Sequence, residues 1–139
     1  MRVEAYLRVL ADESTVRAIH AEANVPNASV KQLKAPRNTS SGEMWWNWET
    51  KRIPIESENP DDGLRALLQA HREIFPIIKK NRTETDIYLE VVTQYDEGEE
   101  PQGLYLSAET VQLLSEMGGA LDNDVVIVAN ESDKARRNS

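Results

Sequence analysis

Histidine and carboxylate side chains are the groups in this chain that could do acid–base or metal chemistry. The two histidines, His20 and His71, each fall near the apolar face of an expected helix. A metal site at either one would need carboxylates brought in by the fold, because the chain has no cysteine and no second histidine at helical spacing. We therefore expect packed or half-exposed histidines, no metal site and no cofactor.

Acidic residues concentrate in three short stretches, residues 61–62, 96–100 and 122–124. The spacing of a calcium-binding loop is absent, and the sequence does not show that any two of these carboxylates face each other. Solvated turns and helix starts explain them. The sequence also has no phosphate-binding loop, serine elbow or Walker motif, so it assigns no catalytic residue.

Three tryptophans, Trp45, Trp46 and Trp48, are the most unusual feature of the chain. On a strand over residues 44–49, Trp46 and Trp48 share one side and Trp45 points to the other. One interpretation is that helices or loops cover both sides. The other is a protein interface, because tryptophan is enriched at binding hot spots, and we name all three as candidate interface residues.

The longest helical pattern follows this strand and runs from Asp61 to about Lys80. Its apolar face comprises Leu64, Leu67, Leu68, His71, Ile74, Phe75 and Ile78. Asn59 can cap the first turn, where two acids meet the positive end of the helix dipole. Pro76 lacks an amide proton, so we expect a kink or a loosened last turn there.

Alternating apolar residues predict the strands of a sheet. The predicted strands are residues 2–10, 29–33, 44–49, 86–95, 103–106 and 125–128. An acidic turn joins residues 86–95 to residues 103–106, and a hairpin is the economical interpretation. Residues 125–128 are apolar on both faces, which predicts an interior strand. Residues 34–43 have the composition of a mobile loop.

Two shorter helices complete the pattern. The first is capped by Asp12 or Ser14 and ends by Asn24. The second begins after Ser107 and ends at Gly118, where glycine can adopt a left-handed conformation. Its predicted inner face comprises Val111, Leu114 and Met117.

This order of elements predicts an α+β fold. We expect a single layered domain with a mainly antiparallel sheet, helices packed on it, a ferredoxin-like start (βαββαβ) and a βαβ extension. The domain would span residues 1–129, and residues 130–139 would form a polar, flexible tail. A chain of 139 residues is long enough for one such core.

The net charge and the hydropathy of the chain limit its partners. The formal net charge is −8, which repels phosphate backbones, so we expect no nucleic-acid partner. No apolar run is long enough for a signal peptide or a membrane span, which favours a cytoplasmic protein without a membrane partner. A basic protein or a second copy in a homodimer is the better match.

Four motifs together resemble one protein family. They are Gly42 followed by Trp46 or Trp48, the acid-and-leucine helix after them, GLYLS at residues 103–107, and GALDNDVV at residues 119–126. The chain resembles the bacterial Domain of Unknown Function 4279 family over roughly residues 3–128. It departs from the family's frequent Asp-Ile-Tyr ending, because Val125 and Val126 stand there. The resemblance implies a small bacterial cytoplasmic protein and no established activity.

The sequence therefore favours a non-catalytic protein-binding domain, dimeric through a sheet edge or the tryptophan strand. One version is an immunity-type protein that binds a basic toxin nuclease and blocks its active site electrostatically. The alternative is a hydrolase or metal-dependent enzyme that uses His71 with loop carboxylates. That alternative requires these groups to converge in one pocket.

Overall fold

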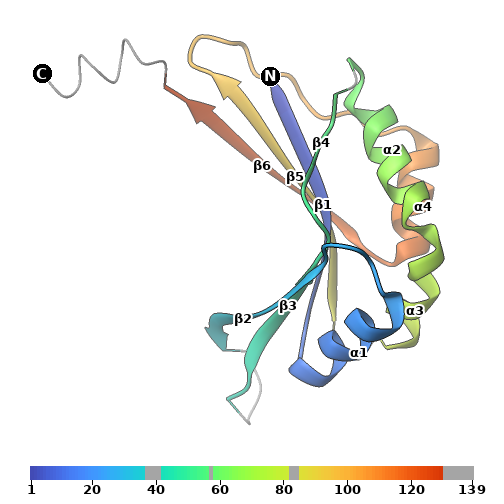
Figure 1. Ribbon diagram of the computed structural model, residues 1–139. Helices are drawn as coiled ribbons and strands as arrows, with labels where there is room; N and C mark the ends of the chain where they lie inside the picture. The colour runs from blue at the N-terminus through green and yellow to red at the C-terminus, as the bar shows by residue number, and fades with distance from the viewer. Residues whose placement is uncertain (37–41, 57, 82–84, 130–139) are drawn as a thin grey trace, which may run out of the picture.

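Strand β1 (Arg2–Ala11) lies at the centre of the sheet, and the rest of the chain is arranged around it (Figure 1). The computed structural model describes residues 1–36, 42–56, 58–81 and 85–129. The other elements are α1 (Glu13–Ala23), β2 (Ser29–Pro36), β3 (Met44–Glu49), β4 (Ile53–Pro54), α2 (Pro60–Ala70), the 3₁₀ turn η1 (Arg72–Ile74), α3 (Phe75–Lys80), β5 (Asp86–Asp96), α4 (Ala108–Met117) and β6 (Ala120–Val128). The fold is α+β, as predicted.

Alternation along β1 creates the core. Val3, Ala5, Leu7 and Val9 are buried on one face and pack in a single cluster with side chains of the helices. Figure 1 shows these helices on one side of the sheet. Between β3 and β4, Thr50 continues the pairing with β1, because its backbone amide donates to the Leu7 carbonyl at 3.0 Å and its Oγ1 accepts from the Leu7 amide at 3.0 Å. β1 is therefore hydrogen-bonded along both edges.

The sheet confirms the ferredoxin-like start and the βαβ extension. Its order is β2-β3-β1-β5-β6, with β4 paired to β1 on the side of β3. Helix α1 connects β1 to β2, and β3 lies between these two strands in the sheet. Helix α2 lies on the connection from β3 and β4 to β5, and β1 lies between β3 and β5. The two units therefore interleave. All described strand pairs are antiparallel except β5 and β6, which run parallel and are connected by α4.

The predicted hairpin after β5 is wrong, because residues 101–107 form no strand. Both edges of β5 are already paired, one with β1 and the other with β6. The segment instead crosses to α4 and is held by side chains. The Tyr95 hydroxyl donates to the Gln102 carbonyl at 2.6 Å and accepts from the Gln102 amide at 3.0 Å. Asp61 Oδ1 accepts from the Ser107 amide at 2.8 Å. β5 therefore serves as the first strand of the βαβ extension.

The last strand lies at an edge of the sheet, and the prediction that it is interior is wrong. Within the described part of the chain, β6 pairs with β5 alone. Val125, Val126 and Ile127 are 54%, 40% and 62% exposed. Apolar side chains on both faces predicted burial, but the chain places no described strand on the outer side of β6. Figure 1 shows the end of this strand extending beyond the helices.

The long predicted helix is divided at His71 rather than at Pro76. The His71 Nδ1 atom lies 2.9 Å from the Leu67 carbonyl, and the His71 amide donates to the carbonyls of Leu67 and Leu68. One 3₁₀ turn follows before α3 begins. Pro76 falls in the first turn of α3, where its missing amide proton leaves no helical hydrogen bond unmade. The break therefore precedes the proline.

The shorter helices begin and end at the predicted residues. The Asp12 side chain accepts from the backbone of α1, and the Ser107 side chain accepts from the backbone of α4. Helix α1 ends at Asn24 with a φ of 47°, and α4 ends at Gly118 with a φ of 78°. Both left-handed residues satisfy the last carbonyls of their helices.

Two predicted helix faces need correction. Val111 was predicted on the inner face of α4 but is 49% exposed. The buried residues of α4 are Thr110, Leu113, Leu114 and Met117. They follow the i, i+3, i+4, i+7 pattern, and this face leaves Val111 about 100° away around the helix. His20 was predicted near the apolar face of α1, but it is exposed, because Val16 and Ile19 supply the buried turn.

The three tryptophans of β3 have different environments. Trp48 lies opposite Val9 on the helix side and is 0% exposed. Trp46 is on the same side but only partly buried, and the Arg17 guanidinium lies 5.0 Å from its ring centroid. Trp45 is partly buried, and alternation turns it to the other side of the sheet. Trp48 is therefore a core residue and cannot line a surface.

Some predicted segments lie outside the described residues. These are the tail at residues 130–139 and residues 37–41 of the predicted loop at 34–43. Strand β2 continues to Pro36 and so includes the first residues of that loop. None of the described helices is both long and apolar enough to cross a membrane.

We expect Trp48→Ala to lower the free energy of unfolding by about 3–5 kcal/mol, because it leaves a large cavity in the core. Trp48→Phe is the matched control. The indole Nε1 has no hydrogen-bond partner among the described residues, so phenylalanine loses volume but no hydrogen bond. Urea unfolding measures both changes. An alanine variant that is as stable as the phenylalanine variant would contradict the position of Trp48 in the core.

Candidate functional site on the helix-free face of the sheet

The face of the sheet turned away from the helices carries most of the polar side chains that β1, β3, β5 and β6 contribute. We call it the helix-free face. Alternation and the strand registers place these residues on it: Glu4, Tyr6 and Arg8 from β1, Trp45, Asn47 and Glu49 from β3, Tyr88, Glu90 and Val92 from β5, and Asp122, Asp124 and Val126 from β6. Ionisable groups thus gather where no described helix covers the sheet.

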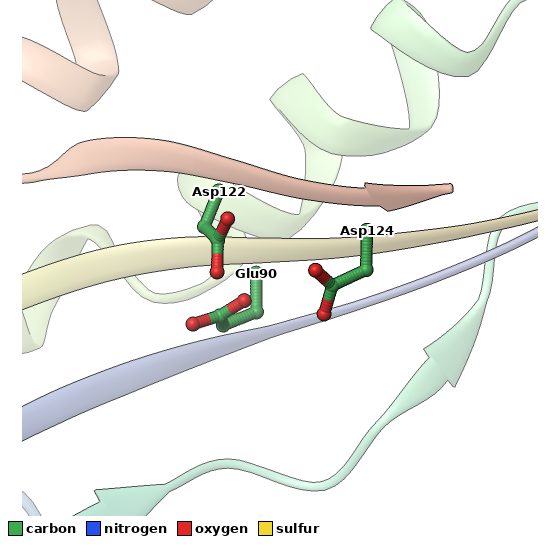
Figure 2. A group of neighbouring side chains, drawn as sticks. All are labelled: Glu90, Asp122 and Asp124. Carbon is green, nitrogen blue, oxygen red and sulfur yellow. The ribbon is translucent and has the colours of Figure 1, made fainter. Parts of the chain in front are cut away.

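Three carboxylates form the most concentrated group on this face. Glu90 lies beside Asp122 in the parallel register of β5 and β6, and Asp124 is two residues further along β6. One oxygen from each lies within 4.8 Å of the others. Figure 2 shows all three side chains on the same side of the two strands. We call Glu90, Asp122 and Asp124 the carboxylate cluster.

Glu90 is the buried member of the carboxylate cluster. Its side chain is only 3% exposed, whereas Asp122 and Asp124 are exposed. Burial, a hydrogen bond with Asp122 and the charge of Asp122 together raise the pKa of Glu90 to about 7, against the opposing effect of Arg8. Near neutral pH, Glu90 therefore carries a proton for part of the time.

Arg8 connects the carboxylate cluster to β3. Its Nη1 lies 3.4 Å from Glu90 Oε1, and its Nε donates to Asn47 Oδ1 at 2.8 Å. The Asn47 amide nitrogen in turn donates to Glu49 Oε2 at 3.2 Å. These bonds hold the guanidinium across three strands, so a rigid positive charge lies beside the acids.

Tyr6 and Arg52 shield another part of this face from water. Its ring is buried, and the Arg52 guanidinium lies 4.6 Å from the ring centroid and donates to the Tyr6 hydroxyl at 3.3 Å. Such stacking shields the ring and its neighbours from water. On this face, long side chains therefore exclude water from buried groups, as the helices do on the other face.

The carboxylate cluster could do two kinds of chemistry. Its oxygens are close enough to bind a hard cation such as Ca²⁺ or Mg²⁺. Alternatively, Glu90 can exchange a proton near neutral pH, and the group then acts as a surface whose charge depends on pH. Sequence reasoning missed this group. The available signal was an acid in the middle of a strand, but its meeting with residues 122–124 depends on the β5–β6 register.

The other predicted acids have structural contacts. Glu99 of the turn after β5 accepts from the Met1 amine at 2.9 Å and from the Asp96 amide at 2.9 Å. Asp61 is buried and accepts from Arg65 at 3.2 Å as well as from Ser107. Burial raises the pKa of Asp61, but the hydrogen bonds from the Ser107 amide and neighbouring hydroxyls lower it more, and the result lies below the usual value.

The histidines do not join the carboxylate cluster. His71 lies at the end of α2, in the helix layer on the opposite side of the sheet, and its Nδ1 contacts the Leu67 carbonyl. His20 is exposed on α1. Of the three candidate interface residues, Trp45 lies on the helix-free face, Trp46 lies beside α1, and Trp48 is buried.

Comparison with protein-family models finds a match over residues 1–127 to the family described as Domain of unknown function (DUF4279). The chain belongs to this family. Comparisons with curated proteins and with solved structures find no match. This match confirms the family predicted from the sequence. The description of DUF4279 names no activity, so the function must be argued from the helix-free face itself.

In this DUF4279 protein, the pKa of Glu90 makes stability depend on pH. Its folded pKa of about 7 lies above its ordinary value of 4.5. The stability that the protonated form of Glu90 contributes to the folded protein is therefore fully present below about pH 4.5. It is lost as the pH rises through 7. Glu90→Gln mimics the protonated form. We therefore expect the free energy of unfolding of the variant to exceed that of the native protein by on the order of 1–3 kcal/mol between pH 5 and 8.

Urea unfolding at a series of pH values measures this difference. Glu4→Gln is the matched control, because Glu4 lies on the same face of β1 but is exposed. We expect the control to follow the native protein at every pH. A difference between Glu90→Gln and the native protein that stays constant with pH would contradict the assigned environment of Glu90.

Proposed function

We propose that this chain is a non-catalytic protein-binding domain that binds a basic partner protein on its helix-free face. The observation that supports the proposal most is the carboxylate cluster. Asp122 and Asp124 are exposed beside the buried Glu90, on the face that no described helix covers. Exposed carboxylates held in fixed positions on strands offer lysine and arginine side chains short, charge-assisted hydrogen bonds.

The charge of the whole chain supports the same partner. A net charge of −8 attracts a basic protein at long range, and a local acidic surface fixes its orientation at short range. Trp45 lies on the same face and is only partly buried, so it can add apolar contact area. One form of this function is an immunity-type protein of bacterial cytoplasm that covers the active site of a basic toxin nuclease.

The alternative function is a hydrolase or metal-dependent enzyme that uses His71 with loop carboxylates. It has less support, because His71 and the carboxylate cluster lie on opposite sides of the sheet. The His71 Nδ1 atom is also engaged with the Leu67 carbonyl. A general base must reach its substrate, and an imidazole in the helix layer cannot reach a substrate bound by these three acids.

Co-expression with the products of the adjacent genes tests the proposal, followed by calorimetry on any complex. We expect a complex with a basic product. The Asp122→Asn, Asp124→Asn double variant should raise its Kd by about tenfold or more, which corresponds to ~1.4 kcal/mol. Added salt should also raise the Kd, because it screens the attraction between opposite charges.

Glu109→Gln provides the control variant. Glu109 lies on α4, its side chain is 79% exposed, and its removal changes the net charge without touching the helix-free face. We expect this variant to bind the partner as the native chain does. Equal weakening by both changes would mean that only the net charge matters, and no loss in the double variant would place the partner elsewhere. Either result rejects this face as the binding site.

A further inference from the structure

The outer edge of β6 is apolar and has no described strand paired to it. Val125, Val126 and Ile127 are between 40% and 62% exposed, whereas the other exposed large apolar side chains of the described residues are scattered. Acids precede them at Asp122 and Asp124 on the same strand. Exposed strand edges pair readily with other strands unless charges or prolines guard them. The acidic half of β6 has such guards, and the apolar half does not.

The backbone groups at this edge can be assigned by alternation. The Val128 carbonyl accepts from the Glu97 amide at 2.9 Å, so the backbone of Val128 is turned toward β5. Successive residues of a strand present their N–H and C=O groups to opposite edges. Val126 is therefore also turned toward β5, while Val125 and Ile127 present their backbone groups to the open edge.

We propose that two copies of this chain form a homodimer by antiparallel pairing of their β6 strands about a two-fold axis at Val126. Val125 of each copy then lies opposite Ile127 of the second copy, and both residues present backbone groups to the shared edge. Each such pair can exchange both of its hydrogen bonds. The two Val126 residues face each other as the intervening non-hydrogen-bonded pair, which brings their side chains close together.

The acids disfavour registers centred on the acidic half of β6. A dimer centred on Asp124 would place that carboxylate directly opposite its own copy, and like charges in facing positions are destabilising. In the register centred on Val126, Asp124 faces Val128 of the second copy and Asp122 lies beyond the apolar pairs. Val125, Val126 and Ile127 therefore face apolar side chains, and the acidic half of each strand stays away from the acidic half of the other.

The dimer would join the two sheets into one. Paired residues point to the same face of a continuous sheet, so both helix-free faces lie on one side of the dimer. Two carboxylate clusters then flank the two-fold axis on a common surface. This inference does not depend on the proposed function, since self-association and partner binding use the edge and the face respectively.

Single cysteines test the register, because the native chain contains none. Facing residues of a non-hydrogen-bonded antiparallel pair have Cα atoms about 4.5 Å apart, which lies within the range for a disulfide. Under mild oxidation we expect Val126→Cys to form a disulfide-linked dimer at least about tenfold faster than Val125→Cys or Ile127→Cys. In the proposed register the new thiol of either slower variant faces a native apolar side chain rather than a second thiol. Val111→Cys on α4 measures the rate of random collision, because Val111 is similarly exposed.

Sedimentation equilibrium of the native protein and of two lysine variants tests the edge itself. We expect a native dimer that strengthens with added salt, because salt screens the repulsion between copies of charge −8. Ile127→Lys should give a folded monomer, and Val111→Lys should dimerise as the native protein does. A native monomer at millimolar concentration, or open-ended aggregates instead of dimers, would overturn the proposal. Equal crosslinking at Val126 and Val111 would overturn it as well.

Discussion

The fold depends on one constraint, which is that all the helices in the described part of the chain cover the same face of the sheet. Alternate residues of β1 are fully or nearly fully buried on that face, from Val3 to Val9, and side chains of α1, α2, α3 and α4 complete a single core with them. The main apolar core thus lies on one side of the sheet. The other side has to satisfy its polar groups by itself, through contacts between side chains.

The helix-free face solves this problem with ion pairs and stacked rings. Arg8 bridges Glu90 and Asn47, and Arg52 covers Tyr6. These long side chains exclude enough water to leave Glu90 almost fully buried, although no described helix lies above it. A carboxylate in that position is penalised by desolvation and by the nearby charge of Asp122. The face therefore has a charge that changes close to neutral pH, and this property arises from packing rather than from composition.

Local signals in the sequence predicted the helices and most of the strands. The wrong predictions concern features that depend on contacts between residues far apart in the sequence. The caps at Asp12 and Ser107 were predictable because each side chain bonds to the backbone three residues later. The hairpin after β5 was not excluded by any local signal, since only the pairing of β5 with β1 and β6 removes its free edges. The carboxylate cluster has the same origin. Glu90 meets Asp122 through a parallel register that α4 and the preceding crossover set, and no spacing in the sequence encodes that register.

The two halves of β6 show how one strand can direct two kinds of contact. Next to α4 the strand carries Asp122 and Asp124, whose charges discourage another strand from adding there. Beyond the helices it carries Val125 to Val128, where an added strand would gain both hydrogen bonds and apolar contact. An acidic strand throughout would have kept the edge unpaired, and an apolar strand throughout would have allowed pairing in several registers. The division between the halves therefore favours pairing at the apolar end of the edge while it leaves the carboxylates exposed on the face.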